Sequence, residues 1–275
     1  MKTHKKIKDH FLTKEVFSLV RHDEGVLRTT PKLTDALLSK YYDSEQYASH
    51  NNVQGVLGFV YTFISKQMLK IKFRTIKRHI KNNGLVVDFG CGKGDFVSYV
   101  KGQNIKAVGV ENNRSALEVC KKRQLNVLDS ISNIKSEINV ITFWHSFEHL
   151  SKPEKIITAI KNYTNKDSIV VIALPNFKSF DAKYYDKFWA AYDVPRHRFH
   201  YSKFGIKQTM KKLGFQCVNT KPMFFDALYI SMISEKFKNN KLFFVKGLVV
   251  GVISNFVGFF NSNYSSNIFV FKKAI

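Results

Sequence analysis

The sequence has few of the residues that form metal ribbons or disulfide frameworks. Among 275 residues there are three cysteines, Cys91, Cys120 and Cys217, which lie far apart without a C-x-x-C pair. This spacing argues against both a zinc ribbon and disulfide bonds and fits a reducing compartment. The N-terminal stretch MKTHKKIKDHF is basic but lacks the apolar core of a signal peptide. We therefore expect a cytoplasmic protein.

Acidic residues are also scarce. The chain has 21 acidic and 44 basic residues, which give a net charge of +23. An acidic partner therefore has to be considered: RNA, an anionic membrane surface, or a phosphorylated or carboxylated substrate. Residues 53–81 illustrate this, because they have the spacing of a long helix whose second half is basic and contains no acid. A solvated, lysine-rich helix surface is the interpretation we favour for that stretch.

Two common nucleotide-binding fingerprints are missing. No G-x-x-x-x-G-K-[ST] run exists, and the stretch LVVDFGCGKGDF at 85–96 does not complete G-x-G-x-x-G, because its third glycine comes one residue early. The apolar run 85–87 nevertheless predicts a buried strand, which Asp88 closes. Gly90, Gly92 and Gly94 then allow positive φ and let backbone amides approach a ligand at a helix N-terminus. This is the pattern of a cofactor loop.

A second acidic residue indicates which cofactor. Glu111 ends the next apolar run, about twenty residues after the glycines, where a carboxylate can accept both ribose hydroxyls. An acid before G-x-G-x-G together with an acid after the second strand resembles the class I S-adenosylmethionine-dependent methyltransferases. The resemblance implies a site for S-adenosylmethionine formed by Asp88, Gly90, Cys91, Gly92, Gly94, Glu111, Asn112, Asp129 and His145.

The rest of the chain alternates predicted strands and helices. Strands are expected at 85–88, 107–111, 126–128, 140–144 and 169–174, with further strands at 215–219 and 267–271 in the tail. This rhythm predicts an α/β fold: a Rossmann-like, doubly wound sheet, mostly parallel with a C-terminal antiparallel strand and helices on both faces. Ligands in such sheets bind beyond the carboxyl ends of the strands.

Two segments stand apart from this domain, which we place at 53–275. Residues 1–52 are expected to be a helical or irregular extension ending in an aromatic-acidic cluster at 41–47. Related bacterial methyltransferases often carry a cysteine-rich ribbon here, so the extension is either a metal-free remnant over the cofactor cleft or a surface arm. An apolar insertion at about 224–262 is expected to pack on the sheet or lie on a membrane surface rather than to span a membrane.

Two further stretches concern the methyl acceptor. The run FWHSFEHL at 143–150 resembles a segment of ubiquinone-pathway-like O-methyltransferases, in which His149 would take a proton from a hydroxyl acceptor or only cap a helix. The run FWAAYDVPRHRFHYS at 188–202 is similar to an element of the bacterial "methyltransferase domain 23" type. This resemblance implies an acceptor pocket lined by Trp189, Tyr192, Arg196 and His200, with His197 as a second catalytic candidate. The alternative is a loop that is locked by the packing of its Trp and Pro residues and has only a structural role. No acid or cysteine near His197 and His200 completes a ligand set, so no metal is expected.

The sequence therefore predicts a methyltransferase that acts by in-line displacement on a hydroxyl of a small or membrane-associated metabolite. Its partners would be a small-molecule or lipid-like acceptor and, peripherally, an anionic membrane. Methylation of RNA ribose is an alternative that the charge suggests, although nucleic acid is not favoured. A non-catalytic module that retains the cofactor loop is the alternative from another class. A nicotinamide enzyme is disfavoured by the glycine spacing.

Overall fold

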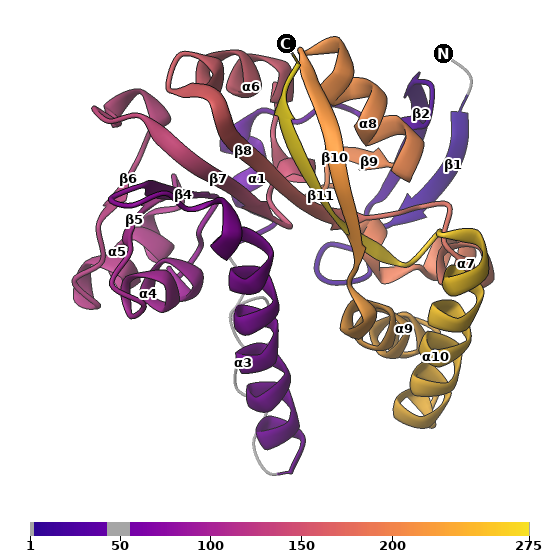
Figure 1. Cartoon of the computed structure of the whole chain (residues 1–275). Coiled ribbons are helices and arrows are strands. Elements are labelled where there is room, and N and C mark those ends of the chain that lie inside the picture. The colour runs from indigo at the N-terminus through magenta and orange to yellow at the C-terminus, as the bar shows by residue number, and fades with distance from the viewer. Residues whose placement is uncertain (1–2, 43–55, 275) are drawn as a thin grey trace.

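The computed structural model describes residues 3–42 and 56–274, and its largest element is a seven-stranded sheet with the order β10-β11-β8-β7-β4-β5-β6 (Figure 1). The five strands from β8 to β6 are parallel, whereas β11 is antiparallel to both of its neighbours. This sheet confirms the predicted fold class. Its strands are β4 (Leu85–Phe89), β5 (Lys106–Val110), β6 (Val127–Leu128), β7 (Ile138–Trp144), β8 (Thr164–Pro175), β10 (Phe215–Pro222) and β11 (Ser266–Lys273).

Helices cover both faces of this sheet, which is why its central strands are continuous apolar runs. In β8, Val170 and Ile172 pack into one core cluster, and Ile169 and Val171 pack into another. Helices α6 and α8 contribute to the first cluster, and α3 and α4 contribute to the second. The helices around the sheet are α3 (Val56–Ile76), α4 (Asp95–Lys101), α5 (Arg114–Lys122), α6 (Pro153–Lys161) and α8 (Lys203–Lys212).

The N-terminal extension forms a second sheet, so the prediction that it is helical or irregular was wrong. Strands β1 (Thr3–Lys8), β2 (Val16–Asp23) and β3 (Val26–Thr30) pair antiparallel, and β3 continues the sheet onto β9 (Phe199–Tyr201). Two signals were available: the alternating buried Phe17 and Leu19, and a two-residue turn that ends in Gly25 at φ 72°. The cluster predicted at 41–47 is described only at Tyr41 and Tyr42, and its residues 43–47 lie outside the described residues.

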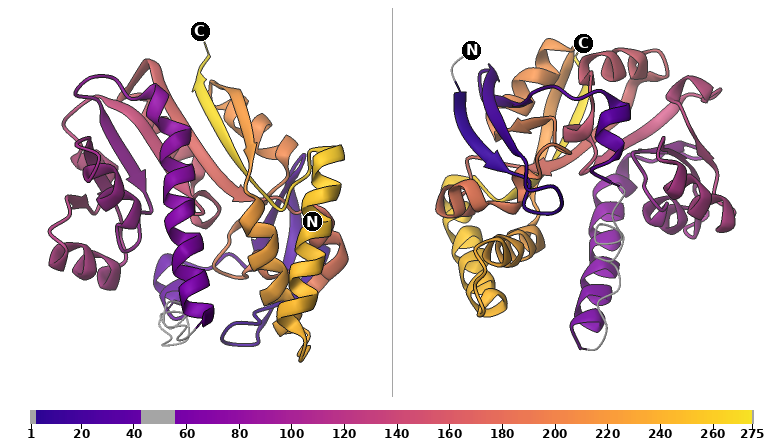
Figure 2. Two further views of the ribbon diagram at one scale, coloured as in Figure 1. Left: turned by 60° about the horizontal axis from the view of Figure 1, so that its bottom comes forward. Right: turned by 180° about the vertical axis from the view of Figure 1, so that it is seen from behind.

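The apolar insertion between β10 and β11 is a helical hairpin made of α9 (Phe224–Phe237) and α10 (Phe243–Asn261). One side of α10 packs on α9, because Gly247 and Gly251 let the two helices approach closely. Among the described residues, α10 alone is long and apolar enough to cross a membrane by length and composition, and 28% of the window that passes this test is buried. Figures 1 and 2 show α3 and the α9–α10 pair projecting from the same side of the molecule.

Candidate active site

The loop between β4 and α4 combines one tightly packed glycine with one open glycine. Gly90 has φ 71°, and a Cβ placed on it would lie 2.5 Å from the Cβ of Ser146. Gly92 has φ 54°, and a Cβ placed there would meet no atom within 4 Å. The loop is therefore held against the segment after β7 at one end and leaves free space at the other. Free space beside a glycine at positive φ lets a nucleotide-type cofactor approach the backbone of the loop closely.

Glu111 lies directly beside that space. Its Oε2 accepts a hydrogen bond of 2.9 Å from the Gly92 amide, and its Oε1 accepts bonds of 2.8 and 2.9 Å from the amides of Asn112 and Asn113. Asp129 follows β6 on the adjacent strand and accepts a bond of 2.8 Å from the side chain of Asn133. The residues predicted to bind the cofactor thus lie after β4, β5 and β6, at one edge of the sheet. The Glu111 carboxylate still has lone pairs that can accept hydrogen bonds from ribose hydroxyls.

Two of the predicted cofactor residues point their side chains into the protein. Asp88 is 4% exposed and accepts a bond of 2.7 Å from the Thr142 hydroxyl. Burial raises the pKa of Asp88 to about 6, against the opposing effects of Thr142 and Lys72. Cys91 faces β5, where a Cβ on Gly109 would lie 2.5 Å from its sulfur, and burial raises the pKa of its thiol. A cofactor contact of Cys91 would therefore use its backbone.

His145 follows β7 at φ 55° and belongs to a charged network that the sequence did not reveal. Its Nε2 lies 3.0 Å from Asp226 Oδ2 on α9, and its Nδ1 lies 3.6 Å from Glu148 Oε1. Burial alone would lower the pKa of His145, but these two carboxylates raise it to about 10. Asp226 was missed because nothing local marks a residue of the distant insertion as a partner of this loop.

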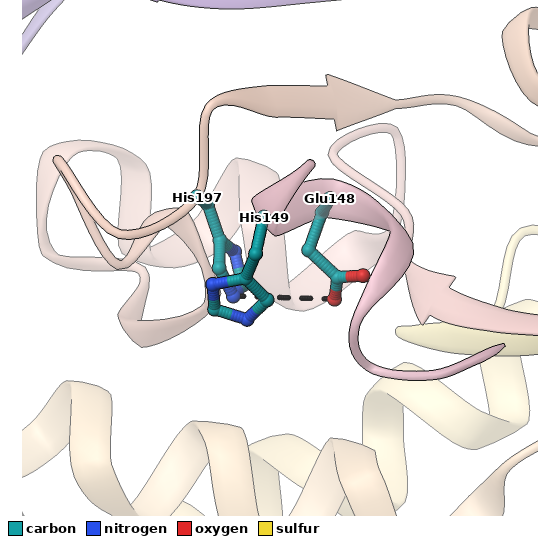
Figure 3. A group of neighbouring side chains, drawn as sticks. All are labelled: Glu148, His149 and His197. Atoms are coloured by element: carbon teal, nitrogen blue, oxygen red, sulfur yellow. Dashed lines mark ion pairs between the residues drawn. The ribbon is translucent and has the colours of Figure 1, made fainter. Parts of the chain in front are cut away.

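Glu148, His149 and His197 converge on one point, although two of them were separate candidates in the sequence (Figure 3). Glu148 and His149 lie on the short 3-10 helix η3 (Phe147–His149), whereas His197 precedes β9. The two imidazole centroids are 4.6 Å apart. Burial and the neighbouring His197 lower the pKa of His149 to about 4. Although burial acts in the opposite direction, His145 and His197 lower the pKa of Glu148 to about 2.

Arg196 was predicted to contact an acceptor, but its side chain is buried and paired with other groups of the protein. The side chain is 0% exposed, and its guanidinium donates to Asp9 at 2.9 Å, to Asp193 at 2.8 Å and to the Tyr41 carbonyl at 3.2 Å. These partners lie in the N-terminal extension and in the same loop. Arg196 therefore anchors the second sheet.

The other three residues predicted to line the acceptor pocket are buried as well. Trp189, Tyr192 and His200 are at most 5% exposed, and burial lowers the pKa of His200 to about 3. The motif was predicted to be open to an acceptor, but here it forms the contact between β9, the extension and α7 (Phe180–Tyr185). Three hydrogen bonds make this contact. Trp189 Nε1 donates to Asp181 Oδ2 at 2.7 Å, and Lys5 Nζ donates to Tyr192 Oη at 3.5 Å. His200 Nε2 and Thr29 Oγ1 are hydrogen-bonded at 2.9 Å.

Comparisons with known proteins concern the family and the fold of this chain. The family described as "Methyltransferase domain" matches residues 63–220, which is more than half of the chain. No curated protein matches. The chain is similar to the magnesium protoporphyrin IX methyltransferase of Synechocystis PCC 6803 with bound SAH, with TM-score 0.56, 11% identity, and 88% of this chain and 100% of that chain covered.

Two other solved structures share the fold. A SAM dependent methyltransferase from Archaeoglobus fulgidus has TM-score 0.52 and 20% identity, with 78% of this chain and 100% of that chain covered. The [4+2]-cyclase SpnF has TM-score 0.53 and 12% identity, with 75% of this chain and 81% of that chain covered. At these identities the likeness concerns the fold alone. The family match and the strand order together confirm the predicted class, and the chain belongs to the methyltransferase domain family, with the fold of the class I S-adenosylmethionine-dependent methyltransferases.

Proposed function

We propose that this protein transfers a methyl group from S-adenosylmethionine to a hydroxyl group of a small or membrane-associated metabolite. The observation that carries the proposal is the direct contact between the glycine loop and the segment that bears the histidines. Ser146 Oγ donates to the Phe89 carbonyl at 2.5 Å, and Gly90 leaves no room for a side chain beside it. The glycine loop that would bind S-adenosylmethionine and the imidazole of His149 therefore follow two neighbouring strands, β4 and β7.

The chemistry asks little of the protein beyond positioning and one proton acceptor. S-adenosylmethionine supplies a methyl group on a sulfonium, and the S–C bond breaks as the new O–C bond forms. Gly92 and Glu111 would hold the nucleoside so that the methyl lies in line with the acceptor oxygen. Burial and His197 lower the pKa of His149 to about 4, so its imidazole is neutral at pH 7 and can take the proton that the hydroxyl loses, although only as a weak base.

The surface of α10 supports a membrane-associated acceptor. Its outward side carries large apolar side chains that are 41–73% exposed, while the residues on its other side pack on α9. Exposed lysines stand at its N-terminal end, among them Lys241 and Lys246. An apolar face next to positive charge is typical of a helix that lies in an anionic membrane surface. The apolar residues in this exposure range are Leu242, Val245, Val249, Val252, Ile253, Phe256, Phe259 and Phe260, and Phe244 is 37% exposed.

Positive charge also gathers around a cavity of about 570 Å³ that lies away from the glycine loop. Its lining contains five lysines and His10 but no acidic residue. This favours an anionic partner, and a phosphorylated headgroup has a suitable size. Retention of RNA that weakens with salt would instead favour the RNA alternative. The lysines are Lys6, Lys8, Lys14, Lys187 and Lys236.

Calorimetry with S-adenosylmethionine tests the proposal. We expect the wild type to bind in the micromolar range and the variants Gly92→Arg and Glu111→Ala to bind at least about 100-fold more weakly, because the first fills the open space and the second removes the predicted ribose acceptor. Gly102→Arg and Glu118→Ala are matched controls at exposed positions near α4 and α5 and should bind like the wild type. A folded wild type that binds nothing would favour the non-catalytic module.

A further inference from the structure

Glu148, His149 and His197 form a compact group of side chains with metal-ligating atoms. One such atom from each residue lies within 4.8 Å of the others, and Figure 3 shows the three side chains pointing toward one another. Two histidines and one carboxylate are a common ligand set for catalytic metal ions in proteins. The sequence hides this set, because His197 lies on a different loop from the other two.

The hydrogen bonds of the histidines leave the correct nitrogen free. His197 Nδ1 lies 2.9 Å from the Ala191 carbonyl, and His149 Nδ1 lies 3.1 Å from the Arg196 carbonyl. A carbonyl only accepts, so these contacts are satisfied when each Nδ1 carries the proton, and each Nε2 then presents a lone pair. The Tyr42 hydroxyl also lies 3.0 Å from His149 Nδ1 and accepts from it in that tautomer. Histidines that bind metals are usually oriented in this way by a backbone carbonyl or a carboxylate.

The carboxylate of Glu148 is the second, independent observation. The residue is 1% exposed, and neither of its oxygens accepts a hydrogen bond from any described residue. His145 lies 3.6 Å from Oε1, but its other nitrogen is paired with Asp226, so its positive charge is shared between two carboxylates. Buried carboxylates are normally hydrogen-bonded or coordinate a metal. The arrangement therefore has a place for a cation.

We propose that Glu148, His149 and His197 bind one divalent first-row transition-metal ion such as Zn²⁺ or Co²⁺. Two imidazole ligands favour these ions over Mg²⁺ or Ca²⁺, which prefer oxygen. Glu148 Oε1 and His197 Nε2 are 3.9 Å apart. Bonds of about 2.0–2.2 Å in a tetrahedral site would bring ligand atoms to roughly 3.4 Å. The three side chains, whose ligand atoms lie within 4.8 Å of one another, must therefore move inward to bind the ion.

Three protein ligands leave coordination positions open, and this has a consequence that rests on the proposed function. An acceptor hydroxyl bound at an open position becomes more acidic, so its proton passes to water before the methyl arrives. His149 then acts as a ligand instead of a base. The acceptor class would be metabolites whose oxygen can coordinate the ion.

The test is a titration of the full-length, tag-free and chelator-stripped protein with Zn²⁺ by calorimetry and with Co²⁺ by visible absorption. We expect one ion per chain in the wild type and binding at least about 10-fold weaker in Glu148→Gln and His197→Ala. His79→Ala removes a histidine from the 3-10 helix η1 (Lys77–His79), which precedes β4 at the opposite end of the strand, and should bind like the wild type.

A melting experiment separates metal binding from a structural role of the carboxylate. Zn²⁺ should raise the Tm of the wild type and of His79→Ala but not that of Glu148→Gln, which keeps the shape of the side chain. Absence of one-to-one binding in the wild type, or equal binding by Glu148→Gln, overturns the metal site. S-adenosylmethionine binding is measured separately in the presence of EDTA. It tests the proposed function independently, because the protein can bind the cofactor without a metal ion and a metal ion without the cofactor.

Discussion

The guanidinium of Arg196 lies 2.9 Å from the carboxylate of Asp9, although 187 residues separate the two in the sequence. The side chains of both residues are at most 1% exposed. Asp9 also accepts bonds from the amides of Phe11, Leu12 and Thr13, so it organises the turn between β1 and β2. The loop before β9 and the N-terminal sheet are therefore joined by a buried ion pair.

Replacing Asp9 by alanine should destabilise the protein by about 3–5 kcal/mol, because Arg196 would remain buried without this partner. Urea denaturation followed by circular dichroism measures the change in the free energy of unfolding. The matched control is Asp23→Ala, which breaks the exposed pair with Lys212 and should leave the denaturation midpoint unchanged. Equal midpoints for the two variants would contradict the anchoring role of Asp9.

Two glycines of the cofactor loop should respond differently to alanine. Gly92→Ala should cost only about 1–2 kcal/mol of stability, because the added Cβ meets no neighbour and the only cost is the positive φ of this residue. Gly90→Ala should cost more, because its Cβ would lie 2.5 Å from that of Ser146. Chemical denaturation of both variants checks this order, and the reverse order would rule out the contact between the two loops.

Asp88 should make the protein less stable as the pH rises. Its pKa is about 6 in the folded protein, above its ordinary value of 3.8, so the folded state favours the protonated form. Its contribution is fully favourable below pH 3.8 and is lost as the pH rises through 6, a loss on the order of 3 kcal/mol.

Asp88→Asn should therefore be more stable than the wild type at pH 7.5, and this advantage should shrink toward pH 4. Unfolding free energies at several pH values measure the difference between the two proteins. Asp167→Asn, an exposed control, should show no such gain at pH 7.5. An Asp88→Asn variant less stable than the wild type at pH 7.5 would contradict the raised pKa.

The exposed face of α10 should bind anionic membranes. We expect the wild type to float with vesicles that contain phosphatidylglycerol and to bind phosphatidylcholine vesicles less well. The double variant Phe256→Asp with Phe259→Asp should weaken binding at least about 10-fold, because it removes two side chains that are 65% and 73% exposed. Val218→Asp, at a 50% exposed position on β10, is the control. Equal flotation of all three proteins would exclude α10 as the contact.

The large sheet could be predicted because its signals are local. The alternation of apolar runs with helical segments appears directly in the sequence, as do the spacing of Gly90, Gly92 and Gly94 and the position of Glu111. Parallel strands then place their carboxyl ends along one edge whatever the surrounding loops do. The N-terminal strands are marked only by a short alternation around Phe17 and Leu19, and the resemblance to a cysteine-rich ribbon predicts no such sheet.

The sequence by itself determined the fold class and the donor loop, since both depend on short-range periodicity and on backbone conformations that glycine permits. Only the tertiary structure decided that Arg196 pairs with Asp9, that Asp226 reaches His145, and that His197 joins Glu148 and His149. A side chain's partner depends on which distant segments the fold brings within a few ångströms. The sequence therefore predicts that Arg196 and His200 bind a ligand, whereas in the structure both are buried and paired with other groups of the protein.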